Sequence, residues 1–173
     1  MSLRRWLGLP EEAGEDPPRG VDEIERALAN LDPQRARHIA LFAYILGRVA
    51  RADHQVTPQE SAEMERIVVD RTALPRAQAS LVVKIATAHG VRHGATEDFL
   101  VTREFAGAAS RSDRLALLDC LLELSASDRS IVILEDNEIR RITSELKLEH
   151  ADFIAARAAY LDHLKVLGRA PKD

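Results

Sequence analysis

The sequence is poor in the residues that most often identify a chemistry. It has one cysteine in 173 residues, and its aromatic content is 4%. A single cysteine excludes an intramolecular disulfide, and within LLDCLLEL we expect Cys120 to be a small buried apolar residue. With few aromatic side chains, the core has to be built from Leu, Ile, Val and Ala, which favours packed helices.

An excess of positive charge is also missing. The chain carries 24 basic and 28 acidic residues, a net charge of −4. Because nucleic acids attract basic surfaces, we predict no nucleic-acid partner. No segment approaches the length of a transmembrane helix, and residues 1–20 lack the sustained apolar run of a secretory signal. The prediction for localisation is therefore the cytoplasm.

The apolar residues that are present recur at helical spacing, and no stretch alternates with the period of a strand. A hydrophobic fraction of 46% and a length of 173 residues suit one globular domain. The sequence therefore predicts an all-α, single-domain bundle of about seven or eight helices. We place this domain at residues 21–168, between tails at 1–20 and 169–173.

One stretch occurs twice, at residues 53–67 (DHQVTPQESAEMERI) and 128–142 (DRSIVILEDNEIRRI). The copies are 75 residues apart and align without a gap. A repeat of this kind indicates one supersecondary unit used twice. We therefore predict two pseudosymmetric helix-turn-helix repeats, with residues 34–70 superposing on 109–145. The matched polar pairs are Asp53 with Asp128, Glu60 with Glu135, Glu63 with Glu138, and Arg66 with Arg141.

The acidic residues of these turns have two interpretations. In the first copy, Thr57, Pro58 and Glu60 occupy the positions of a capping box with proline at the first helical residue. In the second copy Val132 stands in place of Thr57 and offers no capping oxygen, yet Glu135 is retained. Two carboxylate pairs in equivalent turns could also converge on a hard divalent cation. Both interpretations stay open.

The segments ARADHQVTPQE and SASDRSIVILEDNE resemble the paired "alanine-aspartate-glycine … glutamate" turns of TerB-like tellurite-resistance proteins. The resemblance covers roughly residues 21–165. It implies an all-helical fold and a non-enzymatic binding or adaptor role linked to stress or tellurite resistance, with an unidentified protein partner. It also implies a candidate Ca²⁺ or Mg²⁺ site, and no other cofactor. The family's acidic residues correspond by position to Asp53, Glu60, Asp128 and Glu135.

The sequence departs from this pattern at the glycine that follows each aspartate, which is His54 in one copy and Arg129 in the other. If that position needs a left-handed backbone, each replacement costs about 1 kcal/mol. Arg129 also places a cation beside Asp128, where it would compete with a bound metal ion.

The sequence leaves three other functions as alternatives. A metal-dependent hydrolase using the same acids would need a general base, and His54 is the only obvious one. A zinc site at His89 and His93 lacks a third ligand at a suitable spacing, and Gly90 interrupts the helix between them. A homodimeric scaffold without metal is the third alternative. Because no phosphate-binding loop, nucleophile elbow or zinc-protease helix is present, we predict that the protein is not an enzyme.

Overall fold

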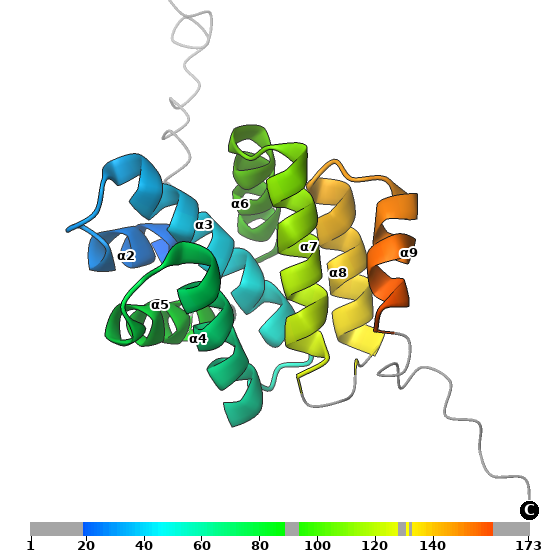
Figure 1. Ribbon diagram of the computed structural model, residues 1–173, viewed down its shortest axis with the longest axis horizontal. Coiled ribbons are helices and arrows are strands. Elements are labelled where there is room, and N and C mark those ends of the chain that lie inside the picture. Colours follow the sequence, from blue (N-terminus) through cyan, green and yellow to red (C-terminus); the bar gives the residue numbers. More distant parts are fainter. Residues whose placement is uncertain (1–18, 89–93, 128–130, 132, 161–173) are drawn as a thin grey trace, which may run out of the picture.

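The computed structural model describes residues 19–88, 94–127, 131 and 133–160. Within these ranges the chain forms eight helices and no strand, which confirms the predicted all-α bundle (Figure 1). None of these described helices is both long enough and apolar enough to cross a membrane. The helices are α2 (Arg19–Ala27), α3 (Pro33–Ala50), α4 (Pro58–Thr72), α5 (Arg76–Ala88), α6 (Gly94–Ala108), α7 (Arg111–Ser125), α8 (Ile133–Glu145) and α9 (His150–Ala158).

The domain limits drawn from the sequence remain a prediction. Helix α2 begins two residues before the predicted start, and Val21 is fully buried. The rest of the N-terminal tail and the C-terminal tail at 169–173 lie outside the described residues.

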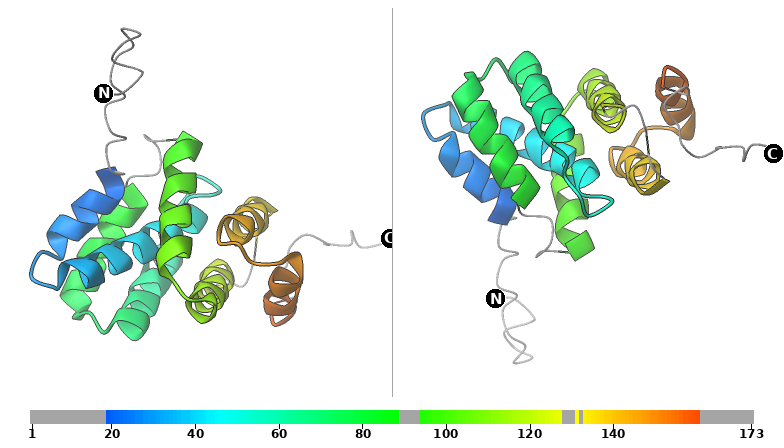
Figure 2. Two further views of the ribbon diagram at one scale, coloured as in Figure 1. Left: turned by 90° about the horizontal axis from the view of Figure 1, so that it is seen from above. Right: turned by 90° about the horizontal axis from the view of Figure 1, so that it is seen from below.

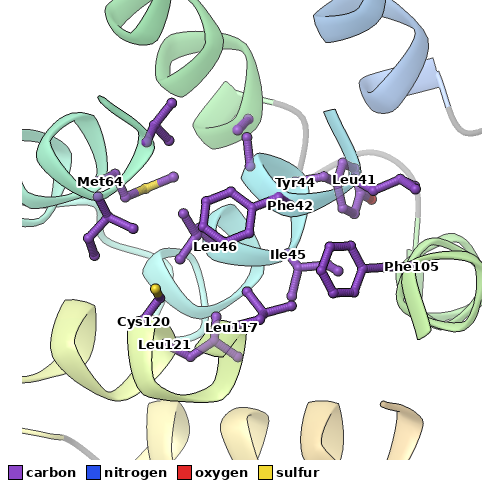
Figure 3. Packing of buried hydrophobic residues seen from close by; sticks show 14 of the residues in the cluster. Leu41, Phe42, Tyr44, Ile45, Leu46, Met64, Phe105, Leu117, Cys120 and Leu121 are labelled. Atoms are coloured by element: carbon purple, nitrogen blue, oxygen red, sulfur yellow. The ribbon is translucent and has the colours of Figure 1, made fainter. Parts of the chain in front are cut away.

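Helix α3 is the centre of the bundle. Its sequence IALFAYIL is apolar on all sides, and every residue from Ile39 to Ala50 is buried. It packs against α2, α5, α6 and α7, and α4 in turn contacts both α5 and α7 (Figures 1 and 2). Figure 3 shows α3 side chains meeting Met64 of α4, Phe105 of α6 and Leu117 of α7. Burial of one large apolar side chain stabilises a fold by about 1.5–3 kcal/mol. The buried side chains of α3 therefore contribute much of the hydrophobic stabilisation of the bundle.

The helix starts follow signals that are local in the sequence. The Asp32 carboxylate accepts hydrogen bonds from the backbone N–H groups of Gln34 and Arg35, and Pro33 is the first residue of α3. The predicted capping box at Thr57 is confirmed at the start of α4. Ser110 forms a second one with Asp113 at the start of α7. Each cap satisfies backbone donors that have no partner inside the helix.

The helix boundaries keep the register of the sequence repeat. Helices α3 and α7 end at Ala50 and Ser125, and α4 and α8 begin at Pro58 and Ile133, so both pairs are 75 residues apart. Figure 1 shows the ends of α3 and α7 and the start of α8 at the lower edge of the bundle. Superposition of the two complete units is a stronger condition, and it stays a prediction.

Candidate functional site

The first acidic turn uses its carboxylates to fix its own backbone. Asp53 accepts a hydrogen bond from the Gln55 N–H at 2.9 Å. Glu60, which is buried, accepts one from the Thr57 N–H at 2.6 Å, while the Thr57 hydroxyl accepts from the Glu60 N–H at 3.1 Å. One oxygen of each carboxylate is therefore engaged in shaping the turn.

His54 has the left-handed backbone that favours glycine. Its φ angle is 66°, and its N–H donates to the carbonyl of Arg51 at 2.9 Å. The conformation expected at the glycine position of the turn is thus present, although the residue is histidine. A residue other than glycine pays about 1 kcal/mol to adopt this left-handed backbone conformation.

The predicted four-carboxylate site cannot be assembled from the described residues alone. Asp128 and Arg129 lie outside them, as do the alternative zinc ligands His89 and His93. Glu135 is buried in the first turn of α8. Among the described residues, no three His, Cys, Asp or Glu side chains lie close enough together to hold a metal ion. Cation binding at Asp53, Glu60, Asp128 and Glu135 therefore stays a prediction.

A charged cleft of about 380 Å³ lies beside the first turn. It is bounded by the end of α3, the turn itself, the end of α5, the start of α6 and the middle of α8. His54 and Val56 of the turn line it, but Asp53 and Glu60 do not. The charged groups that line it are Arg48, Arg51, Asp98, Glu138 and Arg141.

Arg48 forms the floor of this cleft. Its side chain is 0% exposed, and it joins α3 to α8. The guanidinium donates to Glu138 Oε1 at 2.6 and 3.0 Å and to Glu145 Oε2 at 2.6 Å. It also donates to the backbone carbonyl of Asp98 at 2.9 Å and to the Thr102 hydroxyl, both on α6. A charge buried this deeply is tolerated because anions and hydrogen bonds surround it.

The pKa of Arg48 reflects the same balance. Burial by itself would lower the pKa of this guanidinium, but its hydrogen bond to Glu145 and the negative charges of Glu138 and Asp98 outweigh burial and raise the pKa. Arg48 is therefore held in its charged form.

Arg51 is held differently, at the wall of the cleft. Its guanidinium donates to the backbone carbonyl of Ala86 and lies over the ring of Tyr44, 5.6 Å from the ring centroid. Burial lowers the pKa of Arg51. The Tyr44 hydroxyl donates to Asp98 Oδ1 at 3.1 Å, and burial raises the pKa of Tyr44, so this donor keeps its proton.

The cleft therefore presents fixed charges of both signs. Arg141, at the opening, shares Glu145 with Arg48 through a 3.1 Å ion pair within α8. Such a site suits a polar or charged ligand, because its donors and acceptors are already positioned by the fold.

The sequence contained one signal for this cleft that pattern analysis missed. Arg48 follows the apolar segment IALFAYILG, so an arginine in a fully buried helix has to meet carboxylates from elsewhere in the chain. Glu138 was recognised as half of a repeated pair, but Glu145 and Asp98 could not be connected with Arg48 without the three-dimensional arrangement.

Comparison with known proteins gives one match. The family model described as "Tellurite resistance protein TerB" matches residues 38–158, which include α4 to α9 and most of α3. No curated protein and no solved structure matches the chain. The matched segment holds both copies of the repeat and the whole lining of the cleft. Because the match covers well over half of the sequence, the chain belongs to the TerB tellurite-resistance family.

Proposed function

We propose that the protein is a non-enzymatic binding module that contributes to tellurite resistance by binding a polar ligand or partner group in the charged cleft. The observation that carries this proposal is the buried Arg48 network, which fixes charged groups from α3, α6 and α8 around one opening. The family match supports the link to tellurite resistance.

Preorganisation is the physical reason for choosing this cleft. A binding site gains affinity when its polar groups are already held in place, because fewer side chains have to be ordered on binding. Arg51 is held by the Ala86 carbonyl and Asp98 by the Tyr44 hydroxyl, so these two lining residues need no rearrangement to meet a ligand. His54 and Arg141 stand at the same opening and are more exposed.

The ligand of this binding module could also be a protein. Ile133 and Leu134, at the start of α8, are exposed to 58% and 53%. Exposed large apolar side chains next to a turn suit a protein contact, whether with another protein or with a second copy of this chain. Divalent-cation binding at the acidic turns is a separate prediction, and its test is given in the Discussion.

Two neighbouring arginines of α8 provide a matched test. Arg141 lines the cleft and pairs with Glu145, whereas Arg140 lies outside it and pairs with Asp136. Both are about half exposed, and both pairs join residues four apart on the same helix. The variants Arg141→Gln and Arg140→Gln therefore remove the same charge from neighbouring positions of one helix, and Arg140→Gln also removes a guanidinium that lies 5.3 Å from the centroid of the Phe153 ring.

The measurement is growth on potassium tellurite of the source organism lacking the gene, complemented with each variant. We expect the wild type and Arg140→Gln to restore tolerance and Arg141→Gln to restore it poorly, with all three proteins folded and equally abundant. If deletion leaves tolerance unchanged, the proposed role is wrong. If both variants restore tolerance equally, the charged cleft is not the binding site.

A further inference from the structure

A second pocket, of about 350 Å³, lies between α3, α4, α6 and α7 and shares no lining residue with the charged cleft. Its floor is apolar and buried. Ile39 and Phe42 come from α3, Phe105 from α6, and Leu117 and Cys120 from α7. Figure 3 shows these side chains, apart from Ile39, converging around α3. Pockets that hold small organic molecules have this character and begin at about 300 Å³.

The rim of the pocket is basic. Arg35 and Arg71 both line it, and both are exposed at the surface. Arg35 donates to the backbone carbonyl of Thr72 at 2.9 Å, which holds its guanidinium against the end of α4. The guanidinium group of an arginine has five N–H donors, so this single bond leaves others for a ligand.

Arg71 lies near Cys120 at the same rim. It is close enough to the Cys120 thiol to counteract part of the pKa increase that burial causes there. The two arginines therefore border one opening, with the apolar floor directly below them.

The remaining polar groups of the rim leave the positive charge in excess. The ring of His38 packs on Phe105, with 5.1 Å between ring centroids. Asp113 contributes the one carboxylate in the lining, and it is occupied by Ser110, whose hydroxyl and backbone N–H it binds at 2.7 and 3.1 Å. The lining therefore contains two guanidinium groups and one carboxylate, and that carboxylate already accepts hydrogen bonds from Ser110.

We propose that this pocket binds a small organic carboxylate with an apolar body. The body lies on the floor formed by Phe42, Phe105 and Leu117, and the carboxylate binds between Arg35 and Arg71. Apolar burial supplies affinity, and the pair of guanidinium groups selects an anionic head because planar N–H donors match a carboxylate. This inference is independent of the cleft and of the role in tellurite resistance.

Three variants of the full chain test the proposal. Arg71→Gln removes one cation from the rim. Ala116→Leu enlarges a half-buried lining residue of α7 and fills the pocket. Arg76→Gln is the matched control, because Arg76 is also exposed but does not line the pocket. The two-dimensional amide spectrum of each variant confirms that it is folded.

The probes are phenylacetate and hexanoate, with phenylacetamide as the uncharged counterpart, titrated by calorimetry and by amide chemical shifts. We expect the carboxylates to bind with dissociation constants of about 0.1–1 mM and the amide to bind at least about tenfold more weakly. Arg71→Gln should weaken carboxylate binding by about tenfold and Ala116→Leu should abolish it, with Arg76→Gln unchanged.

Cys120 offers an independent readout, because it is the only cysteine of the chain and lines the pocket floor. A bound carboxylate should slow its reaction with a thiol reagent in the wild type and in Arg76→Gln, but not in Ala116→Leu. The proposal is overturned if neither carboxylate binds when it is added at about 10 mM, because at that concentration even a very weak ligand would occupy much of the site. It is also overturned if acid and amide bind equally, or if Arg71→Gln and Arg76→Gln behave alike.

Discussion

Replacing Arg48 by methionine is expected to destabilise the fold by about 3–5 kcal/mol, because the substitution leaves buried carboxylates without their cation. Methionine fills most of the space of the arginine stem, so the loss is mainly electrostatic. Most of this loss of stability comes from Glu145, because its side chain is only 7% exposed. Glu138, at 19%, is more open to water and recovers part of its solvation.

The structure also predicts how this loss can be reversed. In Arg48→Met/Glu145→Leu the more deeply buried carboxylate is gone as well. Glu138, which is partly open to water, still lacks Arg48, and the half-exposed Arg141 loses Glu145. Replacing both members of a buried ion pair by apolar residues is often nearly neutral. We therefore expect the double variant to regain at least half of the stability that Arg48→Met loses, which is about 1.5–2.5 kcal/mol.

The assay is urea unfolding followed by far-UV circular dichroism, with the free energy of unfolding extrapolated at an unchanged slope. For a chain of this length, a loss of 3–5 kcal/mol corresponds to a decrease in Tm of about 6–20 °C. A loss below about 1 kcal/mol in Arg48→Met would refute the reasoning, because it would show that the buried carboxylates do not need this cation. So would a double variant that is less stable than the single one.

Three further predictions concern the turns and the buried thiol. His54→Gly should stabilise the protein by up to about 1 kcal/mol in the same urea assay, because glycine relieves the left-handed strain at φ 66°; a loss of stability would show that the histidine side chain makes contacts worth more than the strain. Burial raises the pKa of Cys120, so above about pH 8.5 the unfolded thiol ionises while the folded one keeps its proton. Stability should then fall by up to about 1.4 kcal/mol per pH unit, and Cys120→Ala should show a shallower decline over the same range; parallel curves for the two proteins would contradict this. If the acidic turns hold Ca²⁺ or Mg²⁺, millimolar cation should raise Tm in the wild type but not in Asp53→Asn/Asp128→Asn, and an unchanged wild-type Tm would end the metal prediction.

Several helix starts could be predicted because they have a local cause. The starts of α3, α4 and α7 depend on a capping residue and the few residues that follow it, all of which can be read in order. The central place of α3 follows from its apolar circumference. The helix ends were less predictable. Helix α4 ends at Thr72 and is followed by Ala73 in a left-handed conformation, with φ 56°, where glycine is the usual signal.

The candidate site could be predicted only in part. The sequence singled out Asp53 and Glu60 for their acidic character, and the structure shows that both carboxylates bind backbone N–H groups of the first turn. The cleft beside that turn depends instead on long-range pairs, such as Arg48 with Glu145, which are 97 residues apart. No local pattern fixes such a distance, because it depends on how α3 and α8 cross.

Charged residues at matching positions of the sequence repeat form two sets of ion pairs. In one set, Arg66 of α4 pairs with Glu63, Asp70 and, across the bundle, Glu123 of α7. Each of these residues has a counterpart 75 positions away that takes part in the Arg48 network. Those counterparts are Arg141, Glu138, Glu145 and Arg48, in the same order.

One of these matching positions carries opposite charge in the two sets of ion pairs. Glu123 is an acid beside the half-exposed Arg66, where solvent screens the pair and its contribution is small. Arg48, which lies 75 positions before Glu123, is fully buried and must keep its carboxylates, because an unpaired charge there would be very costly. Glu138 and Glu145 therefore compensate a buried cation, whereas Glu63 and Asp70 pair with a cation that water also solvates. Matching positions of the sequence repeat are charged in both sets, and the burial of Arg48 is the reason that stability depends more on its set of pairs.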